Sequence, residues 1–164
     1  MNLLNLLTIY LLAIITLSIT AVFSANAAPK SSASFEKALQ DAEMIASLSP
    51  EWSVQRTSGV SMGDFYGDNS LILVQKATIE DIRVGMMVVY RSAEGELISH
   101  KVAEHNGDSL GTIGISNWSM DPFPITSDMI VGTVFGVFHT SGAPVGDIYT
   151  SNGQPLPTAL CKTF

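Results

Sequence analysis

Apolar residues recur at helical spacing in only one short segment after the N-terminal region. The residues at positions 35, 38, 39, 42 and 45 are apolar, Ser34 is placed to cap the N-terminus, and Glu36 falls in the first turn. The helix should end before Ser49-Pro50, because a proline pushes the preceding residue out of helical geometry. The pattern therefore predicts one amphipathic helix that begins near Phe35 and ends before Ser49.

Beyond Pro50 the pattern changes to short apolar runs separated by turn residues, which is typical of strands. Glu94-Gly95 and Asn106-Gly107 are hairpin signals between successive runs. The regular spacing predicts a mostly β domain, either a β-sandwich or a partly open barrel, with one leading N-terminal helix. The expected strands cover residues 52–55, 70–75, 87–91, 96–103, 110–115 and 130–138.

The chain begins with an uncharged apolar segment, residues 3–23, that permits two interpretations. It is long enough to span a bilayer as a helix. The small residues of Ala25-Asn26-Ala27 also suit the −3 and −1 positions of a secretory cleavage site. As an export signal or as a membrane anchor, the segment predicts a periplasmic or extracellular location for the rest of the chain.

The sequence divides into four parts on this pattern. Residues 1–27 are the signal peptide or anchor, 28–50 a linker and the helix, and 51–140 the β domain. Residues 141–164 are rich in Gly, Pro, Ser, Asn and Thr, and we expect an irregular, peripheral tail there.

Composition excludes several function classes. The 164 residues suffice for one compact domain, and 8 Lys and Arg against 15 Asp and Glu give a net charge of −7. Such an acidic chain is a poor partner for nucleic acid. The single cysteine, Cys161, has no internal disulfide partner, and no Cys or His spacing predicts a metal or cofactor site.

Three polar residues provide the minimum equipment for acyl transfer. Ser61 lies among small and flexible neighbours, where a tight turn can present its hydroxyl. His100 lies downstream in an expected strand, and Asp121 follows in a loop. A serine is a weak nucleophile until a base takes its proton, so this trio is a candidate catalytic set.

Two neighbouring residues compete as the base. Side chains alternate between the faces of a strand, so His100 and Lys101 cannot both face Ser61 without a bulge. The pKa of an unperturbed histidine, near ~6.5, suits proton acceptance at neutral pH, whereas a lysine pKa must fall by roughly 3 units. This favours His100 and leaves a Ser61–Lys101 dyad as an alternative.

Five blocks in order resemble the signal peptidase I superfamily, which includes the LexA-type self-cleaving repressors. The serine block 59–62 and the following segment 66–74 resemble the nucleophile box and the strand after it. Ser99-His100-Lys101-Val102 is similar to the His-Arg-Val signature of the archaeal and endoplasmic-reticulum type, which uses a Ser-His pair. The other blocks are 84–91, 114–121 and 130–134, so the likeness spans residues 54–138.

The resemblance implies a LexA/signal peptidase-like fold and a serine endopeptidase that cleaves extended segments of exported polypeptides, signal-peptide-bearing precursors among them. It implies Ser61 as nucleophile, His100 as general base and Asp121 as the residue that orients the imidazole, without a cofactor or metal. Residues 3–23, if retained, would associate the enzyme with the membrane.

The sequence departs from the family pattern in ways that support a different class. Gly63-Asp64 replaces the usual Glu-Pro, and Ile115 replaces the first Asp of the Ser-His branch. An exported β-rich binding or accessory module that keeps the fold without the chemistry is therefore the main alternative. The loop residues Trp118, Met120 and Phe123 either contact substrate or membrane, or cover the open end of the barrel, which we favour.

Overall fold

The computed structural model describes residues 28–164, so the predicted signal or anchor at residues 1–27 lies outside the described part. Within residues 28–164, no helix is long and apolar enough to cross a membrane. The elements are helix α2 (Phe35–Ala46), the short 3₁₀ turns η1 (Ile79–Asp81) and η2 (Ser127–Met129), and strands β1 (Trp52–Gly59), β2 (Ser70–Gln75), β3 (Met87–Arg91), β4 (Leu97–His105), β5 (Ser109–Ile113), β6 (Ile125–Thr126), β7 (Ile130–His139) and β8 (Thr158–Cys161).

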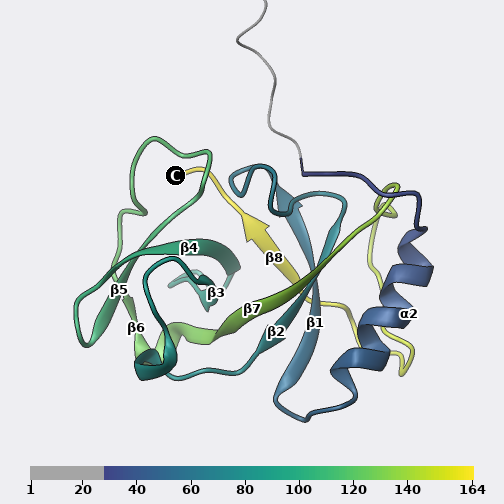
Figure 1. Cartoon of the computed structure of the whole chain (residues 1–164), viewed down its shortest axis with the longest axis horizontal. Helices are drawn as coiled ribbons and strands as arrows, with labels where there is room; N and C mark the ends of the chain where they lie inside the picture. The colour runs from purple at the N-terminus through teal and green to yellow at the C-terminus, as the bar shows by residue number, and fades with distance from the viewer. Residues whose placement is uncertain (1–27) are drawn as a thin grey trace, which may run out of the picture.

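Six strands form a closed mixed barrel in the order β3-β7-β2-β1-β8-β4, and pairing of β3 with β4 completes the ring. β5 pairs with β4 outside this ring, and β6 pairs with β5. Figure 1 shows the curved strands around the barrel and β5 and β6 to one side. The predicted mostly β fold with one leading helix is confirmed, and of the two predicted architectures the barrel is the one that forms.

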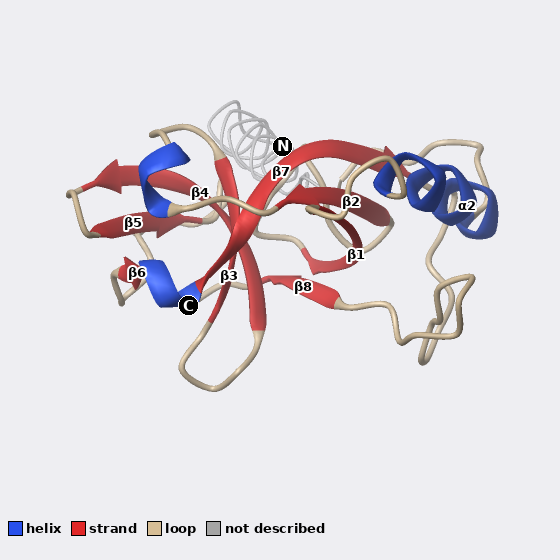
Figure 2. Ribbon diagram, turned by 90° about the horizontal axis from the view of Figure 1, so that it is seen from below, coloured by secondary structure: helices blue, strands red, loops and turns tan. Residues whose placement is uncertain are grey.

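The predicted helix is confirmed. The Ser34 side chain accepts the Lys37 backbone N–H at 3.2 Å, and the helix reaches its C-cap at Ser47, ahead of Pro50. Its buried face, which includes Phe35 and Leu39, packs against residues of β1 and β2. Figure 2 shows α2 at the side of the barrel opposite β5 and β6.

The hairpin predictions are also confirmed. β3 and β4 pair antiparallel across Gly95 (φ 85°), and β4 and β5 pair antiparallel across Gly107 (φ 78°). Positive φ angles of this kind are accessible to glycine at little cost. These two turns set the register that places β4, which carries His100, in the middle of three strands.

The expectation of an irregular and peripheral tail is wrong for residues 158–161. β8 (Thr158–Cys161) lies between β1 and β4 and runs parallel to both. Figure 1 shows β8 in yellow, leading to the C-terminus. The four-residue strand is too short to show a reliable alternation of apolar and polar residues. Its pairing also depends on β1 and β4, which lie about 100 and 60 residues earlier in the sequence.

Candidate active site

The turn that carries Ser61 begins where β1 ends. β1 extends to Gly59, four residues beyond the predicted end of that strand, and Gly59 has a φ of 106° that favours glycine. Asp68 fixes this turn, because its Oδ1 accepts the Gly59 backbone N–H at 2.7 Å and the Ser58 hydroxyl at 3.2 Å. Ser61 follows, buried, and its carbonyl oxygen accepts the Ser116 N–H at 2.8 Å.

His100 meets the serine from β4. Oγ of Ser61 lies 2.9 Å from Nε2 of His100, and both residues are almost completely buried. The residues two positions away on the same face of β4, Ile98 and Val102, are buried and apolar. The imidazole therefore lies in a dry environment with the serine hydroxyl within proton-transfer distance.

Asp121 completes a chain of hydrogen bonds. Its Oδ2 lies 2.6 Å from Nδ1 of His100, and it also accepts the hydroxyls of Thr112 at 2.6 Å and Tyr90 at 2.9 Å. The carboxylate can only accept from these groups when ionised, so we assign the proton of neutral His100 to Nδ1. Nε2 is then free to accept the proton of Ser61.

The electrostatics agree with an ionised carboxylate. Burial raises the pKa of Asp121, but hydrogen bonds from His100, Thr112 and Tyr90 outweigh it and hold this pKa below its ordinary value. The pKa of Tyr90 is raised by burial and by the Asp121 charge, so its hydroxyl remains a donor. The other carboxylate oxygen, Oδ1, is buried without a hydrogen-bond partner among residues 28–164.

Tyr90 and Thr112 contact Asp121 but were not among the site residues predicted from the sequence. Tyr90 is near the end of β3 and Thr112 is in β5, which are two of the three strands that pair with β4. Both residue types are common in strands, and nothing local distinguishes them from ordinary sheet residues. Only the strand order brings their hydroxyls to Asp121.

Lys101 lies apart from this chain of hydrogen bonds. It follows His100 in a regular part of β4, so its side chain occupies the opposite face, and it is half-buried. The β4–β5 irregularity falls between Val102 and Glu104, after both candidate bases. The strand therefore keeps the alternation that favours His100.

The other two histidines lie elsewhere. His105 bonds the Ile79 carbonyl through Nε2 at 3.1 Å, and Nδ1 of His139 lies 3.2 Å from the Ser70 hydroxyl. Over residues 28–164, no group of three or more His, Cys, Asp or Glu is arranged to hold a metal ion.

The prediction that Trp118, Met120 and Phe123 cover the open end of the barrel is wrong, because all three side chains in the loop around Asp121 are exposed. Trp118 is fully exposed, Phe123 is 63% exposed, and Met120 is also exposed. These side chains lie on the surface near the candidate site because the same loop delivers Asp121 to His100.

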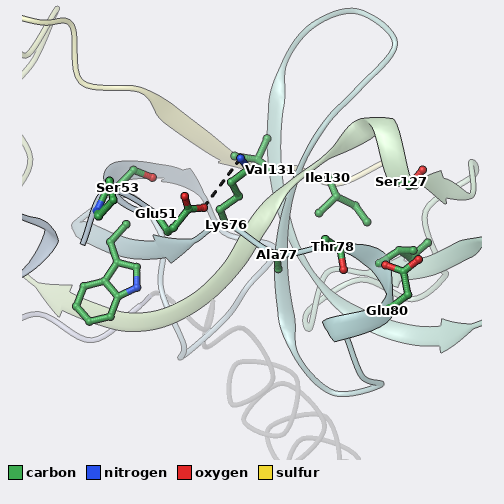
Figure 3. A pocket seen from close by; sticks show the side chains of 12 residues that line it. Glu51, Ser53, Lys76, Ala77, Thr78, Glu80, Ser127, Ile130 and Val131 are labelled. Carbon is green, nitrogen blue, oxygen red and sulfur yellow. Dashed lines mark ion pairs between the residues drawn. The ribbon is translucent and has the colours of Figure 1, made fainter. Parts of the chain in front are cut away.

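Two surface cavities differ in their chemistry. One of about 490 Å³ is lined by residues from the turn before β1, the segment after β2 and the start of β7 (Figure 3). Its charged pair, Lys76 and Glu51, is 4.0 Å apart and largely exposed. Ser61, His100 and Asp121 do not line this cavity. A cavity of about 380 Å³ instead borders Asp121 and is lined by Tyr90, Phe123 and Phe164, among others.

A scan against protein-family models and a search of curated proteins found no match for this chain.

Proposed function

We propose that this protein is a serine endopeptidase that uses Ser61, His100 and Asp121. The observation that carries the proposal is the continuous chain of contacts from Oγ of Ser61 through His100 to Oδ2 of Asp121. The residues come from three separated segments, and their order of roles matches what nucleophilic catalysis by a serine requires. The resemblance of residues 54–138 to the signal peptidase I superfamily supports the same activity.

Each of the three residues has a role in the steps of acyl transfer. His100 takes the proton of Ser61 through Nε2 while Oγ attacks the carbonyl carbon of a peptide bond. Asp121 stabilises the imidazolium that forms, and His100 then protonates the leaving amine. Water hydrolyses the acyl-enzyme in the second half of the cycle. The backbone N–H of Ser61 is one donor for the developing oxyanion.

The Ser58 hydroxyl is not free to act as a second oxyanion donor in this arrangement, since it bonds to Asp68. The proposed substrate is an extended polypeptide segment of an exported protein, with signal-peptide-bearing precursors as one class. An export signal or anchor in residues 3–23 would place the enzyme outside the cytoplasm, in the periplasm, extracellular space or on the membrane surface.

One observation favours a second candidate, a catalytically inactive binding or accessory module. β8 fills the space between β1 and β4, and closes the barrel beside the proposed nucleophile. A substrate strand from another molecule could pair with both β1 and β4 only if β8 left, and a module without turnover does not require this step. The Ser61–Lys101 dyad receives no such support, because Oγ of Ser61 bonds His100.

A fluorophosphonate probe, which reacts covalently with activated serines, tests the proposal without knowledge of the substrate. Peptide mapping should locate the label at Ser61 in wild type, and Ser61→Ala and His100→Ala should remove it. Lys101→Ala is the matched control, one residue along the same strand, and should keep the label. Lack of labelling in wild type would leave the inactive module as the better account.

The same variants should be assayed on a peptide with Ala at the −1 and −3 positions of the cleaved bond. Turnover by wild type and by Lys101→Ala, but not by His100→Ala, supports the Ser-His mechanism. Loss of turnover in Lys101→Ala with retention in His100→Ala would instead support the dyad.

A further inference from the structure

The C-terminal strand β8 runs between β1, which leads into the turn with Ser61, and β4, which carries His100. β8 is parallel to both neighbours, with Cys161 paired to Gly59 of β1 and Leu160 paired to Ile98 of β4. Ser61 follows two residues after Gly59, and His100 follows two residues after Ile98. The end of β8 therefore lies beside both proposed catalytic residues in extended form, which is the backbone conformation that strand-addition recognition requires.

A specific carbonyl of this strand faces the nucleophile. The Ser61 backbone N–H donates to the carbonyl oxygen of Cys161 at 3.3 Å. This is the contact that an oxyanion-hole donor makes with the carbonyl under attack. A Cβ on Gly59 would come within 2.2 Å of the same oxygen, so the approach of this carbonyl depends on glycine at that position.

The side chains of β8 that precede the peptide bond between Cys161 and Lys162 fit a site for small residues. Ala159 and Cys161 alternate with more exposed positions, and both are buried in a cluster that includes Met62 and Tyr66. The cluster leaves them close-packed, so a larger side chain at either position would overpack it.

Residues 162–164, which follow this peptide bond, are also held by contacts with the rest of the protein. Asn117 donates from Nδ2 to the Lys162 carbonyl and accepts the Thr163 hydroxyl, both at 3.3 Å. The Lys162 ammonium lies 2.7 Å from Glu96, and the Phe164 ring stands edge-on to His100 with centroids 6.0 Å apart. The chain therefore continues past the proposed nucleophile on both sides of one peptide bond, as a bound substrate would.

From this geometry we propose that the protein cleaves its own chain between Cys161 and Lys162 and releases the tripeptide Lys-Thr-Phe. The inference rests on the proposed endopeptidase activity and names its first substrate. Cleavage removes the contacts that residues 162–164 make with Asn117, Glu96 and His100 beside the end of β8.

The chemistry balances with water as the only co-reactant. Oγ of Ser61 bonds to the carbonyl carbon of Cys161 as its proton moves to Nε2 of His100. The bond to the Lys162 nitrogen then breaks, and this nitrogen takes the proton from His100. Water, deprotonated by His100, attacks the resulting ester, and Ser61 recovers its proton as the Cys161 carboxylate forms.

The experiment compares the C-terminus of the full chain in wild type and in Ser61→Ala by mass spectrometric peptide mapping. Wild type should end at Cys161, with free Lys-Thr-Phe present, whereas Ser61→Ala should still end at Phe164. The substitution removes a single oxygen, and circular dichroism should show that the fold is retained. When the two proteins are incubated together, Ser61→Ala should keep its tail, because the bond is cut within the same molecule.

A pair of variants at one position tests the small-residue site. Cys161→Ser conserves size and should be processed, whereas Cys161→Leu should slow processing by at least tenfold. Equal processing of both variants would overturn the proposed alignment of the strand.

The remaining outcomes separate this inference from the proposed function. Wild type that reacts with the fluorophosphonate at Ser61 yet retains Phe164 overturns self-cleavage and leaves the endopeptidase standing. Wild type that retains Phe164 and does not react overturns both. Loss of the tripeptide from Ser61→Ala alone in solution assigns the cut to another protease and also overturns the inference.

Discussion

The hydroxyl of Tyr90 donates a 2.9 Å hydrogen bond to Oδ2 of Asp121, the oxygen that also holds His100. Thr112 donates to the same atom. One carboxylate oxygen thus collects three donors from β3, β4 and β5, and an ionised acid is the only form that accepts all three.

Asp121→Asn should lower the rate of fluorophosphonate labelling at Ser61 by roughly 10²–10⁴-fold. An amide that presents its NH₂ to His100 would favour the tautomer with the proton on Nε2, which cannot accept from Ser61. The labelling rate at neutral pH, with the fold checked by circular dichroism, measures the effect. A rate within twofold of wild type would show that Asp121 does not orient the base.

The pH dependence of stability should report the ionisation of Asp121. Its pKa is below the ordinary value in the folded state because the hydrogen bonds outweigh burial, so the folded state favours the charged form. The contribution is present above the unfolded pKa, about 3.9, and is lost as the pH falls through that value toward the folded pKa. Urea unfolding of wild type and Asp121→Asn from pH 7 to pH 3 should show their stability difference shrinking below about pH 5. A difference that is constant with pH would contradict this assignment.

Thr112→Val and Thr140→Val form a matched pair of substitutions at two fully buried threonines. The Thr112 hydroxyl donates to Asp121, whereas the Thr140 hydroxyl donates to the carbonyls of Asn69 and Gly142. Each substitution should lower the free energy of unfolding by about 1–2 kcal/mol. Only Thr112→Val should also slow labelling of Ser61, and equal labelling rates would limit Thr112 to a structural role.

Gly59→Ala should cost far more stability than Gly95→Ala. Both glycines have positive φ, but a Cβ on Gly95 meets no atom within 4 Å, whereas one on Gly59 meets the Cys161 oxygen. The conformational cost alone is about 1–2 kcal/mol, which Gly95→Ala should show in urea unfolding. Gly59→Ala should lose more free energy of unfolding than Gly95→Ala, because the β1–β8 pairing must also shift. Equal losses in the two variants would show that β8 can move away from Gly59 without a loss of stability.

The Cys161 thiol should be nearly unreactive in the folded chain. Burial, with a smaller contribution from the Asp68 charge, raises its pKa to about 12. At pH 8 the thiolate fraction should therefore be on the order of 10³-fold below that of a free cysteine with a pKa near 8.5. Reaction with a chromogenic disulfide should be slow in buffer and fast in urea, and a fast reaction in buffer would show that β8 leaves the barrel readily.

Much of the fold was readable from local patterns. Ser34 and Pro50 bounded the helix, and Gly95 and Gly107 marked two hairpins, because capping and turn conformations depend on residues close in sequence. The strand predictions failed at their ends, since β1 continues to Gly59 through Arg56-Thr57-Ser58, where polar residues hide the pattern. Those residues extend as a strand because β8 and β2 pair with them.

Residue chemistry and local spacing, together with the resemblance, were enough to select Ser61, His100 and Asp121 as candidates and to favour His100 over Lys101 as the base. The contacts of Tyr90 and Thr112 with Asp121, and the position of β8 beside Ser61, were decided by strand pairing in the tertiary structure. Hydrogen bonds between strands join residues distant in the chain, and a four-residue segment such as Thr158–Cys161 acquires its structure only from the two strands that flank it.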